Sequence, residues 1–257
     1  MAIRLKTLRM TMLVVFALPI AARGGLYAVA DHPRSWRTAN WSSTHMLPPA
    51  EQDPEARVLV FAARAGGWKS VFAVHTWVVV KPQNAAAYTR YDVMGFGQPV
   101  RINMHEPDAH WFGDRPRLVA DVRGAQAATA IPKIEAVVKG YPYATWGSYR
   151  VWPGPNSNTF TATLLRAAPE LDIAMPSEAV GRDFRADGSL AGLTGSHTGV
   201  ELSLYGVLGA KLGWIEGVEV NVLGLVAGLD IRRPALKIPG VGRLGLDEVA
   251  VETANAR

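Results

Sequence analysis

An uncharged apolar stretch near the N-terminus places the strongest constraint on this chain. The stretch covers residues 10–22 (MTMLVVFALPIAA) and, after Arg23, continues as GGLYAVA over residues 24–30. A bilayer core about 30 Å thick needs around 20 helical residues, so this stretch is long enough to cross a membrane. Three basic residues precede it, which is typical of a cytoplasmic flank: Arg4, Lys6 and Arg9. The sequence therefore predicts a membrane segment within residues 1–31, with the rest of the chain outside the cytoplasm.

The same stretch also fits a cleaved signal peptide. Its first apolar run of 13 residues has the length of a signal-peptide core, and Ala28-Val29-Ala30 resembles an A-x-A cleavage site. Both alternatives, a membrane anchor and an exported chain, stay open, and both put the domain outside the cytoplasm. The anchor makes membrane lipid a partner of the N-terminal segment.

The composition indicates a folded chain without thiol chemistry. The 257 residues are 49% hydrophobic and 19% charged, which is typical of a globular protein rather than a disordered one. The absence of cysteine excludes disulfides, thiolate metal sites and a cysteine nucleophile. The net charge is +5, but no run of five basic residues and no aromatic RNA-stacking pattern occurs. We therefore expect no nucleic-acid partner.

The segment after the apolar stretch changes character at Arg57. Residues 32–56 are polar and proline-rich, and we interpret them as a linker. From Arg57 onward, short β-rich runs bounded by Gly, Pro or Asn predict strands, among them one at 117–122. The runs 70–80 and 87–95 predict an antiparallel pair in which residue 80 lies opposite residue 87.

Two segments have apolar residues at helical spacing. They are 125–139, which Gly140 ends, and 158–171, which follows a turn-rich stretch. Strands and helices together predict an α+β core over residues 57–174, in which helices pack on an antiparallel sheet.

The C-terminal region, residues 175–257, is rich in glycine. Residues 200–204 (VELSL) and 218–222 (VEVNV) alternate apolar with polar side chains, which predicts strands with one wet face. We expect a β extension packed on the core. A membrane-docking surface is the alternative for the same segment.

Candidate chemistry is concentrated at Ser157 and His75. Ser157 lies in PGPNSNTF directly before a predicted helix, where free backbone N–H groups stabilise an oxyanion. Helix capping is the alternative role for Ser157, and an Asx turn is the alternative to oxyanion binding for Asn156 and Asn158. His75 lies within a predicted strand, and the predicted register puts Asp92 opposite it. A slip of one residue would replace Asp92 by a neighbour.

Several segments resemble an uncharacterised bacterial family, domain-of-unknown-function family 3750. The resemblance spans about residues 35–245 and implies no established activity. The segments that carry it are WKSVFAVHTWVVVKP, TRYDVMGFG, YPYATWGSYRVWPGPNSNTF and GWIEGVEVNVLGLVAGLDIRRPALKIPG.

A second resemblance is to circularly permuted papain-like proteins, the group that includes NlpC-type peptidases and lecithin retinol acyltransferase. In that group a histidine on a strand precedes a nucleophilic cysteine at the start of a helix. The cysteine lies in short sequences similar to Asn156-Ser157-Asn158-Thr159-Phe160. The resemblance implies a permuted papain-like fold, His75 as base and Ser157 in the place of the cysteine. A serine hydroxyl is not appreciably ionised at neutral pH, so it needs a nearby base that a third group orients.

Two segments resemble a metal-binding and a dinucleotide-binding motif, but neither predicts such a site. The segment 105–110 (HEPDAH) differs from the zinc motif H-E-x-x-H by one residue and contains a proline that would interrupt the helix. The segment 240–245 (GVGRLG) matches G-x-G-x-x-G, but the 12 residues after it leave no room for a βαβ unit. We therefore predict no cofactor and no metal ion.

These observations favour an envelope hydrolase or acyltransferase that acts on an amide or ester. In this hypothesis Ser157 attacks, His75 accepts the proton and Asp92 orients the ring. We expect the domain to face the periplasm at the bacterial inner membrane, with a peptidoglycan peptide or a lipid as substrate. The alternative is a non-catalytic envelope binding or scaffolding protein on the same fold.

Overall fold

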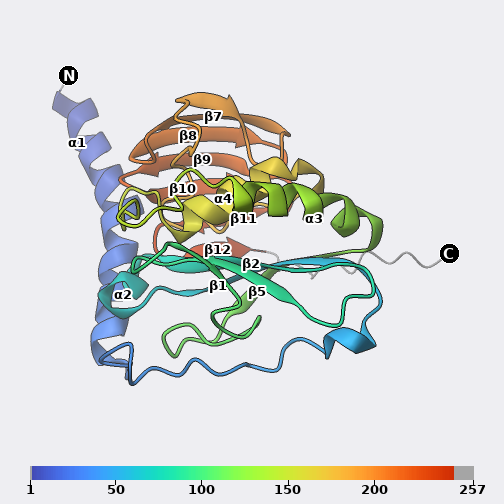
Figure 1. Ribbon diagram of the computed structural model, residues 1–257. Coiled ribbons are helices and arrows are strands. Elements are labelled where there is room, and N and C mark those ends of the chain that lie inside the picture. The colour runs from blue at the N-terminus through green and yellow to red at the C-terminus, as the bar shows by residue number, and fades with distance from the viewer. Residues whose placement is uncertain (1, 246–257) are drawn as a thin grey trace.

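The computed structural model describes residues 2–245 and contains two antiparallel sheets beside a long N-terminal helix (Figure 1). The helix comprises α1 (Ala2–Met12), the π-helical segment η1 (Leu13–Ala17) and α2 (Leu18–Val29). Within it, the 21 residues Arg9–Val29 form a helix that is long and apolar enough to cross a membrane. A signal sequence has the same length and composition, so both alternatives for this segment persist.

The first sheet contains five strands in the order β4-β3-β2-β1-β5, and every neighbouring pair is antiparallel. Its strands are β1 (Arg57–Arg64), β2 (Val74–Lys81), β3 (Thr89–Val93), β4 (Val100–Ile102) and β5 (Arg117–Arg123). The predicted strands and the predicted antiparallel pairing of β2 with β3 are confirmed.

The register of the β2–β3 pair differs from the prediction by two residues. Val80 lies opposite Thr89, not residue 87, because residues 82–88 form a longer connection in which the Ala85 N–H donates to the Pro82 carbonyl. Since side chains alternate between the two faces of a strand, a shift of two residues keeps each side chain on its predicted face. Asp92 therefore stays on the same face as His75.

Two helices cover one face of this sheet, as Figure 1 shows. They are α3 (Gly124–Lys139) and α4 (Ser157–Ala167), which confirms the two predicted helices and the α+β class. The core beneath them contains Val60 and Val78 of the sheet, Ile134 of α3, and Phe160 and Leu164 of α4.

The opposite face of the sheet is covered by the segment that we predicted to be a linker. Trp41 and Leu47 pack there against a second core that contains Phe61, Trp77 and Trp111. The central strands are thus buried on both faces, which explains why their sequences are continuous apolar runs rather than alternating ones.

The C-terminal region forms a second sheet of seven antiparallel strands, in the order β12-β11-β10-β9-β8-β7-β6. The predicted β extension is confirmed. Its strands are β6 (Ala191–Leu193), β7 (Gly199–Leu204), β8 (Leu208–Gly213), β9 (Gly217–Val222), β10 (Leu225–Asp230), β11 (Ala235–Ile238) and β12 (Gly242–Gly245).

These strands have one exposed face, as their alternation predicts, but the exposed face is the apolar one. Glu201 and Glu219 are buried, whereas Leu202 and Val220 next to them are exposed. The physical reason is that the polar side chains face charged partners on the preceding segment and on α4, so the sheet packs with its polar face inward.

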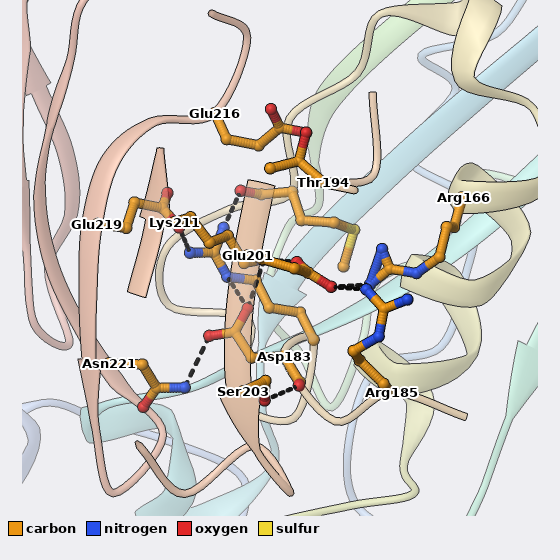
Figure 2. A network of polar contacts seen from close by, with 12 residues as sticks. Arg166, Asp183, Arg185, Thr194, Glu201, Ser203, Lys211, Glu216, Glu219 and Asn221 are labelled. Atoms are coloured by element: carbon orange, nitrogen blue, oxygen red, sulfur yellow. Dashed lines mark hydrogen bonds and ion pairs between the residues drawn. The ribbon is translucent and has the colours of Figure 1, made fainter. Parts of the chain in front are cut away.

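The buried face is held together by ion pairs (Figure 2). Glu201 accepts a hydrogen bond from Arg166 of α4 at 2.8 Å and another from Arg185. The Lys211 ammonium lies 2.6 Å from a carboxylate oxygen of Asp183. Burying charges costs free energy unless each has a partner, and here the charges of opposite sign lie together.

Candidate functional site

A cavity of about 560 Å³ lies at the junction of β2, the start of α4 and the short helix η3 (Gly67–Val71). His75 and Ser157 both line it. The two residues that sequence reasoning proposed as base and nucleophile, 82 positions apart, therefore meet at one cavity.

Ser157 is the first residue of α4 but does not cap it. The cap is Asn156, whose side-chain oxygen accepts from the backbone N–H groups of Asn158 at 2.9 Å and Thr159 at 3.1 Å. The Thr159 hydroxyl accepts from the Asn156 N–H in return, which completes a capping box. The capping alternative for Ser157 is thus wrong, and no partner for its hydroxyl is found among residues 2–245.

Asn158 fixes the start of α4 to the strand that carries His75. Its side-chain amide donates to the carbonyls of Val74 at 2.9 Å and Val180 at 2.8 Å, and its oxygen accepts from the Thr76 hydroxyl at 2.9 Å. The bonds to Val74 and Thr76 lie on either side of His75 in the sequence. These bonds tie the first turn of α4, which carries Ser157, to the strand that carries His75.

The side-chain amides of Asn156 and Asn158 are both engaged with the backbone. The Asn156 amide donates to the carbonyls of Val151 and Val180, each at 3.0 Å. An amide NH₂ offers two hydrogens, so neither asparagine side chain has one left for an oxyanion. The Ser157 backbone N–H is different, because within the described chain no acceptor is found for it.

His75 forms a buried chain of hydrogen bonds with Asp92 and Arg90. His75 Nε2 lies 2.8 Å from Asp92 Oδ1, and Arg90 Nη2 donates to Asp92 Oδ2 at 2.7 Å. Only 6% of His75 and 2% of Asp92 is exposed to solvent. An ionised carboxylate can only accept, so Nε2 carries the proton and Nδ1 keeps its lone pair.

Burial and the two neighbouring charges set the protonation of this chain. Burial lowers the pKa of His75, and the nearby Arg90 lowers it further, while Asp92 opposes both. Burial alone would raise the pKa of Asp92, but His75 and Arg90 outweigh it and bring that pKa to about 2. Near pH 7 His75 is therefore a neutral imidazole, the state in which a general base works.

Three further residues of the site were missed by sequence reasoning. Arg90 was detectable, since it lies two residues from Asp92 on the same strand face. Trp111, whose ring stacks on His75 at 3.5 Å, comes from a loop, and its position has no local signal. Tyr149 also lines the cavity, and burial with the negative charge of Asp92 raises its pKa to about 12, so it keeps its proton.

Much of the remaining lining of the cavity is aromatic. Part of this lining lies close to the N-terminal helix. Trp68, Phe72, Phe96 and Trp152 line the cavity. Helix α2 contacts η3, which carries Trp68. The cavity is therefore an apolar space beside a helix that could lie in lipid.

The family described as "Protein of unknown function (DUF3750)" matches residues 55–184. The chain belongs to this family. The match includes His75, Asp92 and Ser157, and it is shorter than the span of about 35–245 over which the sequence resembles the family. No curated protein and no solved structure matches the chain. The similarity to permuted papain-like proteins therefore stays a prediction.

The two histidines of the zinc-like segment do not share a binding site. His105 stacks on Trp41 at 4.9 Å between ring centres, whereas His110 bonds to the Ser42 carbonyl at 2.9 Å. Among the described residues, no group of three or more His, Asp or Glu side chains is arranged to hold a metal ion.

Proposed function

We propose that this member of the DUF3750 family is a membrane-attached serine hydrolase or acyltransferase that acts on an ester or amide. One observation carries the proposal. A neutral histidine, oriented by a buried aspartate, lines the same cavity as a serine whose hydroxyl has no structural partner in the described chain. Nucleophile, base and orienting group are the three parts that serine catalysis requires.

The proposed reaction begins with attack of the Ser157 hydroxyl oxygen on the substrate carbonyl carbon. His75 Nδ1 takes the hydroxyl proton, and Asp92 stabilises the resulting imidazolium. The oxyanion accepts from the Ser157 backbone N–H at the positive end of α4. When the carbon–oxygen or carbon–nitrogen bond breaks, His75 returns the proton to the leaving group. Water then releases the acyl group as an acid, or an alcohol or amine takes it up.

The lining of the cavity favours a substrate with an apolar portion. Aromatic and aliphatic side chains bind acyl chains through burial of apolar surface, and few polar groups remain to bind a peptide. Of the two substrate classes, a lipid fits this lining better than a peptidoglycan peptide. The basic flank of the N-terminal helix favours a cavity on the periplasmic side of the inner membrane.

Labelling with a fluorophosphonate, combined with hydrolysis of nitrophenyl esters of increasing chain length, tests the proposal. We expect the probe to modify Ser157, and Ser157→Ala and His75→Ala to abolish both labelling and ester cleavage while circular dichroism stays unchanged. Ser42→Ala, which alters an exposed serine of the segment before the core, is the matched control and should keep full activity.

Two results would contradict the enzyme. One is activity that survives in Ser157→Ala, and the other is wild-type protein that neither labels nor cleaves any ester of the series. Either result would leave a non-catalytic binding or scaffolding protein of the envelope as the function.

A further inference from the structure

One face of the seven-stranded sheet is apolar on every strand. The strand registers align one residue from each strand into an unbroken row, in which each side chain lies opposite the next. This outer row consists of Leu193, Val200, Leu212, Val218, Leu229, Leu236 and Leu244. Between 38% and 60% of each of these residues is exposed. Contiguous apolar patches of this extent on a soluble monomer indicate an interaction site.

Buried ion pairs set this orientation of the sheet. A half-buried sheet in water ordinarily turns its polar face outward. Here Glu201, Lys211 and Glu219 point inward, and each is paired with an opposite charge. Sheets that face lipid show this alternation, with apolar side chains pointing outward and polar side chains pointing inward.

Contacts between the second sheet and the N-terminal helix favour lipid as the partner of the outer row. Its segment η1 contacts β10, and the Ile20 side chain packs closely on Gly240 in the turn between β11 and β12. These contacts lie inside the apolar stretch Arg9–Val29, in which every residue is exposed or half-buried. The sheet is therefore attached along the part of the helix that would be surrounded by lipid.

Aromatic residues at the ends of β8 support the same partner. Tyr205 precedes β8 and Trp214 follows it, and both are largely exposed. Tyrosine and tryptophan favour the interface between headgroups and acyl chains, because their rings are apolar and carry one polar group.

We propose that the outer row is a membrane-docking face that lies on the lipid surface beside the N-terminal helix. The face would rest at the boundary between headgroups and acyl chains, as interfacial proteins do. This proposal is independent of the proposed chemistry, since no residue of the outer row lines the cavity.

Site-directed spin labelling of the full chain tests this proposal. Because the chain has no cysteine, Leu212→Cys and Leu236→Cys each give a single labelling site on the outer row. Lys139→Cys, at the exposed end of α3, is the matched control. The labelled proteins are reconstituted into vesicles of phosphatidylethanolamine and phosphatidylglycerol. The collision of each nitroxide with oxygen and with a water-soluble nickel chelate is then measured.

We expect both outer-row labels to collide much less often with the nickel chelate, and more often with oxygen, than the label of Lys139→Cys does. Membrane attachment through the helix cannot produce this result, because the label itself must reach lipid. Nickel accessibility equal to that of the control would place the face in water. Exclusion of both reagents would mean that a second copy or another protein covers it. Either outcome would overturn the proposal.

Discussion

The substitution Asp92→Asn tests whether the buried chain of Arg90, Asp92 and His75 exists as described. Folding lowers the pKa of Asp92 from 3.8 to about 2, so its ionised form contributes about 2 kcal/mol to stability at pH 7. Removal of one member of a buried pair costs up to about 5 kcal/mol when its partner is left without an acceptor. Asparagine keeps one oxygen in place, so we expect Asp92→Asn to lower the free energy of unfolding by about 2 kcal/mol.

The stability lost in Asp92→Asn should decrease as the pH falls. A carboxyl whose pKa is lowered on folding stabilises the protein fully above its unfolded pKa of 3.8, and this contribution disappears as the pH falls through its folded pKa. The stability difference between wild type and Asp92→Asn should therefore be largest at pH 7 and narrow between about pH 4 and pH 2.

Urea denaturation of the detergent-solubilised proteins, followed by circular dichroism, measures both quantities. Asp172→Asn is a suitable control, because Asp172 is exposed and has a left-handed backbone that asparagine also adopts. We expect that control to match the wild type within about 0.5 kcal/mol. Equal stability of Asp92→Asn and wild type at pH 7 would refute the buried ion pair and its orienting role.

Two further predictions concern His75, the proposed general base. The acid limb of the pH profile for ester cleavage should lie below pH 6.5, because burial and Arg90 lower the pKa of His75. The substitution Arg90→Met should shift this limb to higher pH. A limb that does not shift would contradict the effect of the Arg90 charge on His75. Trp111→Ala removes the ring that stacks on His75, so we expect kcat to fall about tenfold or more with little change in KM, as measured by steady-state kinetics. A change confined to KM would instead give Trp111 a role in substrate binding.

The strand pair of the site was predictable in its faces but not in its register. The alternation of β3 gave the side on which Asp92 lies, and a shift of two residues left that side unchanged. The position of Trp111 over His75 depends on how residues 32–56 and the loop that carries Trp111 fold onto the sheet. Such long-range packing leaves no periodic signal in the sequence.

The role of Ser157 and the orientation of the second sheet show what a local pattern leaves open. Asn156 and Ser157 are both good caps, and only the position of the first helical turn decides between them. The alternation in 200–204 and 218–222 predicted strands, but period two does not tell which face meets water. Arg182 and Asp183 in the preceding segment decide it, because they supply charged partners for an inward polar face.

The two bonds of Asn158 around His75 mean that strand and helix move as one body. The start of α4 and the strand of His75 are thus held together before any ligand arrives. Displacement of the N-terminal helix against η3 would therefore alter access to the cavity while leaving this junction of strand and helix in place.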